Sequence, residues 1–268
     1  SRFTYDVVYT NTMRAGAYRG YGATQGQFAV ESIINELADE LNMDPCEIRF
    51  KNMTRENEVL SQYYNEELNA CALDRCLEKA MEMIDYKNKP LRRDMGDFVR
   101  GLVSLSMQGS GISGLDVGSV EIKLQDDGFY TLSIGATDMG TGCDTILAQM
   151  VAECMDCDVD QVVTSSLDTD HAPYDTGSYA SSTTYLTGNA TIKTCQILRE
   201  KIIAAGADML DIKLEDADFD GEKVRTEDGK EVTLQQIAGK ATCGVCSELQ
   251  VVKEYSSPIS PPPFMVGA

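Results

Sequence analysis

The spacing of apolar residues predicts several helices along the chain. In residues 24–41 apolar side chains recur on one helical face and acidic side chains fill the opposite face. This pattern predicts an amphipathic helix whose apolar stripe is buried. The stripe consists of Phe28, Val30, Ile33, Ile34, Leu37 and Leu41. The same criterion predicts helices over residues 73–84, 144–155, 185–209 and 233–239.

Two of the helix starts carry capping residues. Asp44 precedes Pro45 and Glu47, which is the order of an N-cap, a first-turn proline and a capping-box carboxylate. A short helix that ends near Asn52 is therefore predicted. Asp74 is expected to cap the helix over 73–84.

Alternation of apolar and polar residues predicts the strands, which lie at 3–9, 99–107, 119–124, 129–134, 161–167 and 249–255. The pair Asp127-Gly128 is a strong hairpin turn and joins two of them. Two further segments are predicted to be loops, the polar residues 54–70 and the acidic residues 210–232. Helices together with mostly hairpin-connected strands indicate an α+β fold. A charged segment at 87–97 without periodicity divides the chain into expected domains of residues 1–96 and 97–268.

One turn stands between a predicted strand and a predicted helix, at Gly135–Gly142. Unpaired amides and the positive end of a helix dipole make such a turn an anion site, and glycine permits close approach of a ligand. The turn lacks the lysine of a phosphate-binding P-loop and the spacing of a dinucleotide fingerprint. A plain strand-to-helix connection stays open as the alternative. Asp138 is expected to cap the turn.

Composition excludes several classes of partner. The chain has 268 residues, 43% of them hydrophobic, and a formal net charge of −20. This charge disfavours nucleic acid and anionic membranes as partners. No apolar run is long enough for a membrane span and no export signal is present, so a cytoplasmic location is expected.

The thiols and the single histidine offer little chemistry. Of nine cysteines, two pairs have Cys-x-x-Cys spacing, Cys154–Cys157 and Cys243–Cys246. A zinc site and a redox pair are possible interpretations, but ordinary packing thiols are favoured because the pairs lie far apart in sequence. His171 is the only histidine, so a multi-histidine metal site is excluded, and it is expected to be an ordinary loop residue.

Three motifs occur in one order and carry a resemblance. They are Asn11–Gln25 with Asn35–Ala38 and Met43–Asn52, then Gly135–Glu153, then Asp168–Gly188. Together they resemble the molybdenum-binding subunit of the xanthine dehydrogenase and aldehyde oxidase family over nearly the whole chain. The resemblance is weakest over residues 210–245.

The resemblance implies a molybdenum hydroxylase with two α+β subdomains, the first ending near residue 96 and the second incomplete. Its cofactor is molybdenum held by molybdopterin, in bacterial members often as the cytosine dinucleotide. The implied substrate is a purine, a related N-heterocycle or an aldehyde. Electrons leave through 2Fe-2S and FAD groups on partner subunits or segments. The remainder of the molybdenum subunit is a further implied partner.

Residue roles follow only from matching positions. Cofactor contacts are implied for Tyr18, Arg19, Gly20, Gly140, Thr141, Gly142, Thr145, Ala180, Ser181, Ser182 and Thr183. Substrate contacts are implied for Tyr21, Gly114 and Leu115. The backbones of Arg19 and Ala180 match positions next to the ligands of the metal. The turn at 135–142 is expected to face the 177–183 loop and the Arg19 loop.

The sequence departs from the family pattern at two positions. Thr141 replaces the usual glutamine, and Gly114 lacks the ring that many members place against substrate, so xanthine is not implied. No catalytic residue is assigned, since the general-base glutamate is expected beyond Ala268 and another cofactor segment before Ser1. The alternative is a catalytically inactive cofactor-binding fragment. A cysteine-held metal in an acidic domain is the weakest alternative.

Overall fold

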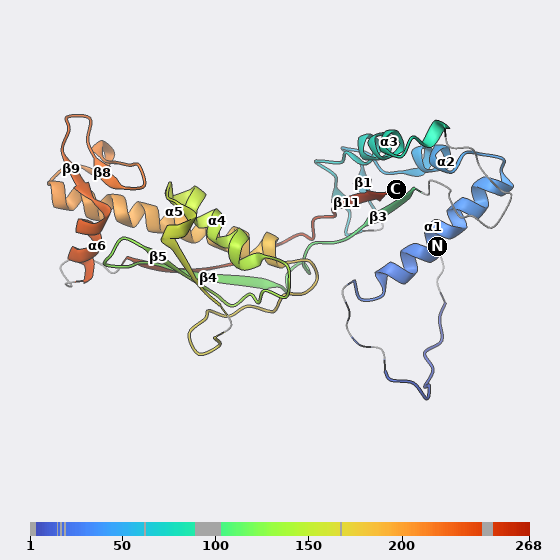
Figure 1. Ribbon diagram of the computed structural model, residues 1–268, viewed down its shortest axis with the longest axis horizontal. Helices are drawn as coiled ribbons and strands as arrows, with labels where there is room; N and C mark the ends of the chain where they lie inside the picture. The colour runs from blue at the N-terminus through green and yellow to red at the C-terminus, as the bar shows by residue number, and fades with distance from the viewer. Residues whose placement is uncertain are drawn as a thin grey trace. The chain divides into compact units, whose positions relative to one another are not determined.

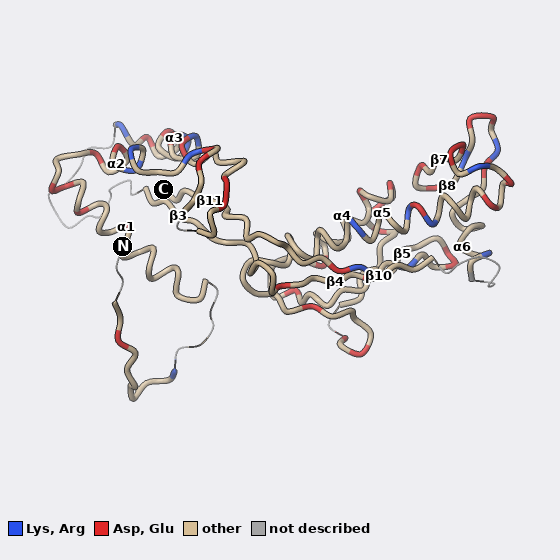
Figure 2. Tube along the Cα trace, turned by 180° about the vertical axis from the view of Figure 1, so that it is seen from behind, with Lys and Arg blue, Asp and Glu red and all other residues tan. Residues whose placement is uncertain are grey.

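The computed structural model describes residues 4–14, 16, 18, 20–61, 63–88, 103–166, 168–242 and 249–268. The chain divides into two compact units, Ser1–Ser106 with Phe264–Ala268, and Met107–Pro263. The domain boundary expected within residues 87–97 lies mainly outside the described residues. Acidic residues occur along the backbone of both units (Figure 2).

Helices and strands are mixed in both units (Figure 1), which confirms the α+β class. The helices are α1 Ala23–Glu40, α2 Pro45–Asn52, α3 Leu73–Met83, α4 Cys143–Met155, α5 Thr183–Leu210 and α6 Leu234–Thr242, with short 3₁₀ turns at Tyr86–Asn88, Val159–Gln161 and Leu214–Asp216. The strands are β1 Val59–Leu60, β2 Glu66–Glu67, β3 Ser104–Met107, β4 Val117–Leu124, β5 Tyr130–Ile134, β6 Val162–Ser165, β7 Asp218–Phe219, β8 Lys223–Arg225, β9 Glu231–Thr233, β10 Gln250–Ser256 and β11 Phe264–Gly267.

The larger unit is built on a four-stranded sheet in the order β10-β4-β5-β6. β4 and β5 form the predicted antiparallel hairpin, with Leu124 opposite Tyr130 and Gly128 at a φ of 88° in the turn. β5 and β6 are parallel, and α4 makes the connection between them. The β5–α4–β6 unit places the glycine-rich turn at the end of a sheet strand.

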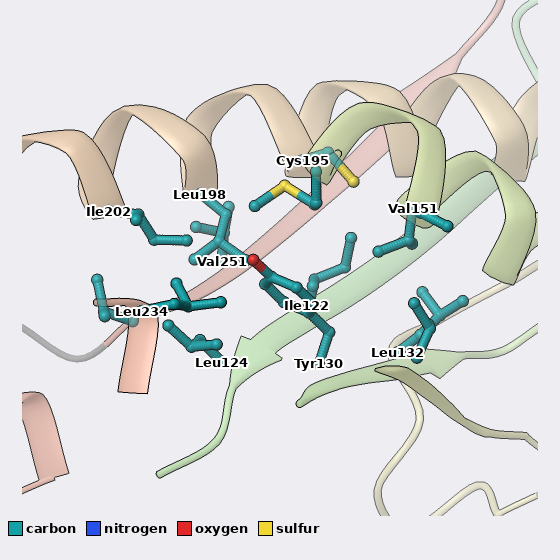
Figure 3. Packing of buried hydrophobic residues seen from close by; sticks show 14 of the residues in the cluster. Ile122, Leu124, Tyr130, Leu132, Val151, Cys195, Leu198, Ile202, Leu234 and Val251 are labelled. Carbon is teal, nitrogen blue, oxygen red and sulfur yellow. The ribbon is translucent and has the colours of Figure 1, made fainter. Parts of the chain in front are cut away.

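The core lies between this sheet and the two helices α4 and α5, which cover the same face (Figures 1 and 3). Alternate residues of β4 and β5 point into the core and are fully buried. They pack against α4 and α5 through Val120, Ile122, Tyr130, Leu132, Ile134, Leu147, Val151, Leu198 and Ile202. The intervening residues Glu121, Lys123 and Thr131 are half-buried on the other face.

A second sheet, β7-β8-β9, lies in the segment predicted to be a loop. Its apolar residues Phe219, Val224 and Val232 are buried in the same core as α5. A Cβ on Gly206 of α5 would lie 2.6 Å from the Val224 side chain, so glycine permits this close approach. The strands are two or three residues long, which is too short for alternation to be recognised.

In the smaller unit, the predicted cap of α2 is confirmed and that of α3 is wrong. The Asp44 carboxylate accepts the N–H groups of Cys46 at 2.7 Å and Glu47 at 3.1 Å. The N-cap of α3 is Ala72, without a side-chain bond, because Asp74 lies inside the first turn. A short pairing of β1 with β2 also replaces part of the expected 54–70 loop.

One burial prediction and one strand prediction in this unit are wrong. The predicted stripe of α1 is mostly exposed, with Phe28 at 76% and Leu37 at 47%, and Ala38 alone is buried among the residues of α1. Residues 4–10 are exposed and lie in no strand. Periodicity identifies a face that can be buried, but burial requires a covering element, and the described part of the chain supplies none over these faces.

An ion pair holds α1 to α2 and to the strand β3. Glu31 Oε2 accepts from Arg49 Nε at 3.0 Å and Nη2 at 2.7 Å, and also from the Leu105 amide at 3.0 Å. The Arg49 side chain is 1% exposed.

Among the described residues, no helix combines the length and apolar character needed to cross a bilayer.

Candidate functional site

The turn Gly135–Gly142 connects the end of β5 to the start of α4, as predicted. Gly140 and Gly142 adopt left-handed backbone, with φ values of 97° and 73°. Asp138 Oδ1 accepts the amides of Gly140 at 2.8 Å, Thr141 at 3.0 Å and Gly142 at 3.2 Å. The turn therefore binds an anion, and that anion is the chain's own carboxylate. The expected capping role of Asp138 is confirmed.

The amide bonds lower the pKa of Asp138, with those from Gly140 and Gly142 the largest causes. Because the folded pKa lies below the unfolded one, the stabilising effect is present at neutral pH and is lost as pH falls through the folded value. The side chains of Thr141 in the turn and of Thr145 in the first turn of α4 are exposed. A Cβ added at Gly140 or Gly142 would meet nothing within 4 Å, so the outer surface of the turn is open.

The 168–182 loop lies directly against this turn. Ser178 Oγ donates to the Thr137 carbonyl at 2.7 Å and accepts the Thr137 amide at 3.1 Å. A Cβ on Gly135 would be in hard contact with the Pro173 carbonyl oxygen and 2.7 Å from Asp175 Cβ. The two segments singled out from the sequence, 135–142 and 177–183, are thus side by side in the larger unit.

Two consecutive residues of this loop, Ala180 and Ser181, have left-handed backbone with φ values of 51° and 56°. Residues other than glycine rarely adopt this conformation, and each instance costs about 1–3 kcal/mol. Ser182 follows as the N-cap of α5, and its hydroxyl donates to the Tyr179 carbonyl at 2.7 Å. Strained backbone of this kind is concentrated at functional sites.

A third loop, residues 108–116, completes the group of segments. The Gly111 amide donates to the Ala180 carbonyl at 2.8 Å. Gly114 and Leu115, the predicted substrate residues, lie in this loop, and Leu115 is 72% exposed. The Gly114 amide bonds the Ser257 carbonyl at 3.1 Å. The substrate and cofactor candidates of the larger unit therefore belong to loops that contact one another.

The remaining candidates lie in the smaller unit. Tyr18, Gly20 and Tyr21 belong to the loop before α1, and both tyrosine side chains are exposed. Tyr21 has a φ of 49°, which makes it a left-handed non-glycine residue as well. Arg19 lies outside the described residues.

Two carboxylates, the buried Asp116 and the half-buried Asp175, support the 168–182 loop and were not predicted from the sequence. Asp175 Oδ1 accepts the Gly177 amide at 2.8 Å, and Oδ2 accepts from Thr187 Oγ1 at 3.2 Å. Burial raises the pKa of Asp175, and the charge of Asp116 raises it further. No local sequence signal identifies an aspartate as buried, because both lie in polar loops.

Replacing Asp175 by asparagine is expected to change the pH dependence of stability. A carboxylate with a raised folded pKa costs stability as pH rises from the unfolded pKa through the folded one. Asparagine keeps an acceptor for the Gly177 amide and does not titrate. The stability difference, D175N minus wild type, should therefore be more positive at pH 7 than at pH 4. Urea unfolding at both pH values checks this, and an equal difference at both would contradict it.

Within the described residues, the other side chains considered from the sequence form no site. His171 is exposed, and its Nδ1 contacts Asp168 Oδ2 at 2.9 Å. Cys154 and Cys157 are free thiols packed against the core, and a hydrogen bond from Cys195 lowers the pKa of Cys154 to about 7. Cys243 and Cys246 lie outside the described residues.

In the part of the chain that the structure describes, one cluster offers metal-ligand atoms. Asp138, Cys143 and Asp144 place these atoms within 4.8 Å of one another. Their oxygens already have protein partners, however: Asp138 Oδ1 accepts the turn amides and Asp144 Oδ2 accepts from Ser166 Oγ at 3.0 Å. The cluster is explained by these bonds, which fix the start of α4.

Comparison with known proteins adds an independent finding. Residues 79–266 match a family described as molybdopterin cofactor-binding domain, and residues 1–53 match another with the same description. The chain is 35% identical over 252 residues to the probable hypoxanthine oxidase XdhD of Escherichia coli, covering 90% of this chain and 26% of that protein. It is also 35% identical over 208 residues to the xanthine dehydrogenase molybdenum-binding subunit of Escherichia coli O157:H7, covering 75% of this chain and 28% of that one.

Solved structures share the fold. CO dehydrogenase from Oligotropha carboxidovorans superposes with a TM-score of 0.73 at 24% identity, covering 91% of this chain and 34% of that one. Quinoline 2-oxidoreductase from Pseudomonas putida 86 superposes with a TM-score of 0.78 at 20% identity, covering 94% of this chain and 35% of that one. The chain spans about a quarter to a third of the lengths of the proteins it matches.

Proposed function

We propose that this chain, which belongs to the molybdopterin cofactor-binding domains of the xanthine dehydrogenase and aldehyde oxidoreductase family, supplies one part of the cofactor site of a molybdenum hydroxylase. The observation that carries the proposal is the junction of the 135–142 turn with the 177–183 loop through Ser178. Both segments lie within the matched family region, and they carry most of the residues that the resemblance assigns to the cofactor.

The residues present fit a polar, anionic cofactor. The surface formed by the two loops carries exposed hydroxyl groups on Thr141, Thr145 and Ser181. Gly140 and Gly142 leave open space at the turn, which permits close approach of a ligand to the backbone. The carboxylate of the turn, Asp138, already has its donors from Gly140–Gly142. Its charge is therefore partly compensated where a phosphate would approach.

Molybdopterin, when bound, supplies the metal centre that oxidises the substrate carbon. The chain's own residues position the cofactor and shape the space beside it. Backbone groups of Ala180 and hydroxyl groups of Ser181 and Thr183 are assigned to the cofactor, together with Thr141 and Thr145. Ser182 matches a cofactor position too, but it is buried and its hydroxyl donates to the Tyr179 carbonyl, so it is assigned a supporting role. Leu115 offers an exposed apolar side chain to the substrate. Tyr18, Arg19, Gly20 and Tyr21 are assigned the contacts that their matching positions imply.

The substrate class we propose is a purine or related N-heterocycle, with an aldehyde as the second possibility. The first is favoured by the hypoxanthine oxidase and xanthine dehydrogenase names of the 35% identical relatives. The cytosine dinucleotide form of the cofactor, 2Fe-2S and FAD partner subunits, and a cytoplasmic location belong to the same proposal. A place in purine catabolism follows if the substrate is a purine.

Metal and cofactor analysis of the intact protein tests the proposal. The complete subunit, purified with its partners from its native host, is expected to contain about one molybdenum and one pterin per chain. Assays with hypoxanthine, xanthine and an aromatic aldehyde then identify the substrate class. Absence of molybdenum and pterin from protein that retains its partner subunits would contradict the proposal.

The alternative is a cofactor-binding fragment without activity of its own. The isolated chain of 268 residues is expected to be inactive, because none of its residues is assigned as the general base. The metal analysis and the substrate assays together distinguish the active enzyme from the inactive alternative. If the intact protein binds molybdenum and turns over none of the three substrates, the inactive alternative is favoured.

A further inference from the structure

We propose that Tyr179 and Asp116 act as positioning residues that hold Ala180 and Ser181 in the left-handed backbone in which they meet the cofactor. The inference rests on the proposed function, because it assigns the Ala180–Ser181 backbone to the cofactor surface. The Tyr179 hydroxyl donates to Asp116 Oδ1. We refer to these two residues as the clamp pair.

The Asp116 side chain is also held in place by a hydrogen bond that does not involve Tyr179. It is 1% exposed, and its second oxygen, Oδ2, accepts the Ile112 amide at 2.7 Å. The side chain therefore spans the 108–116 loop and has each oxygen bonded. A Cβ on Gly111 would lie 3.6 Å from Asp116 Oδ2 and from Ser182 Cβ, so the two loops are in van der Waals contact here.

The clamp pair acts immediately next to the strained residues. Tyr179 precedes Ala180, and the Ala180 carbonyl accepts the Gly111 amide at 2.8 Å. On the other side, the Ser182 amide and hydroxyl both donate to the Tyr179 carbonyl, at 3.1 and 2.7 Å. Ala180 and Ser181 are thus held by bonds to their neighbours on both sides, and these bonds offset their unfavourable backbone conformation.

Charge provides a second argument for a positioning role. Asp116 is a buried carboxylate, and its charge raises the pKa of Asp175, which supports the same loop. Burying a carboxylate costs more free energy than burying an apolar pair of similar volume. The clamp pair is therefore a costly way to stabilise a loop. A charge-assisted bond does, however, fix distance and direction, which a site needs.

Tyr179→Phe tests the clamp pair with the least change in shape, because it keeps the ring and removes the donor. Tyr174→Phe is the matched control, since Tyr174 lies in the same loop and is 71% exposed. Asp116→Asn is the second variant, because the amide retains one acceptor oxygen. All are made in the intact protein with its partner subunits. Amide hydrogen exchange of residues 177–182 is measured in cofactor-free protein, and the rate of molybdenum loss in loaded protein.

Y179F is expected to accelerate exchange in 177–182 about tenfold and molybdenum loss about tenfold, while Y174F changes neither. D116N should give an intermediate change in both. Wild-type exchange in Y179F would overturn the clamp pair itself. Faster exchange with an unchanged rate of molybdenum loss would overturn its positioning role and leave a structural one. Wild-type protein without molybdenum would instead overturn the proposed function, whatever the exchange shows.

Discussion

Glu31→Ala is expected to destabilise the smaller unit by about 3–5 kcal/mol. The substitution removes the carboxylate that accepts two guanidinium bonds from Arg49 and the Leu105 amide. The Arg49 side chain is 1% exposed, so its charge would be left buried without its ion-pair partner. A backbone amide at the start of β3 would lose its acceptor at the same time. The expected loss of stability therefore exceeds the free energy of one ion pair, because the Arg49 guanidinium and the Leu105 amide both lose their acceptor.

Urea unfolding followed by hydrogen exchange on peptides from 23–52 and 63–88 measures this loss in the smaller unit. Glu82→Ala is the control, because its pair with Lys79 is exposed, with side chains 69% and 65% accessible. Exposed pairs contribute about 0–1 kcal/mol, so little change is expected there. Glu31→Gln should lie between the two, since its amide oxygen still accepts. Equal effects of E31A and E82A would show that the buried pair is not what joins α1 to α2 and β3.

The elements that sequence predicted well are those with strong local signals. The helix predicted at 24–41 is α1, and the Asp127-Gly128 turn joins β4 to β5. A full helical period or a turn that requires left-handed glycine is encoded within a few residues. Such signals do not depend on the rest of the chain. The 210–232 segment carries the Asp220-Gly221 and Asp228-Gly229 turns, but its strands have only two or three residues, so their alternation was too short to predict a sheet that packs on α5.

Burial was harder to predict than secondary structure. The face of α1 that carries Phe28 and Leu37 has the periodicity of a core face and is mostly exposed. Tertiary context decides whether an amphipathic face is covered. In the larger unit the same criterion succeeded in part: on the predicted face of α4, Leu147 and Val151 are fully buried in the core with β4 and β5, whereas Ile146 and Met150 are half-buried.

The site was predicted at the level of segments rather than contacts. The 135–142 turn and the 177–183 loop were both identified, and the structure places them together through Ser178. Left-handed backbone at Ala180 has no sequence signal, because alanine does not favour it. The bond between Tyr179 and Asp116 joins residues that are distant in sequence and belong to loops without periodicity. Contacts of this kind depend on the tertiary fold, so no local sequence pattern predicts them.

Gly135→Ala is expected to damage the site, whereas Gly239→Ala, which also adds a single methyl group to the larger unit, is not. The new Cβ would be in hard contact with the Pro173 carbonyl and 2.7 Å from Asp175 Cβ. Because one of these is backbone, the 168–182 loop has to move away from the turn. Overpacking of this kind costs about 1–3 kcal/mol. Displacing the loop by a fraction of an ångström also separates the surfaces assigned to the cofactor, and we expect a loss of about tenfold or more in molybdenum retained.

Gly239→Ala supplies the matched control, because it adds the same methyl group inside α6, where nothing lies within 4 Å. An alanine in a helix should stabilise the protein by about 0.5–1 kcal/mol relative to glycine. The two variants therefore move stability in opposite directions for one chemical change. If G135A retains wild-type molybdenum although its melting temperature falls, contact between the turn and the loop is needed for folding alone. A parallel loss of both supports the junction as the place where the cofactor surface is assembled.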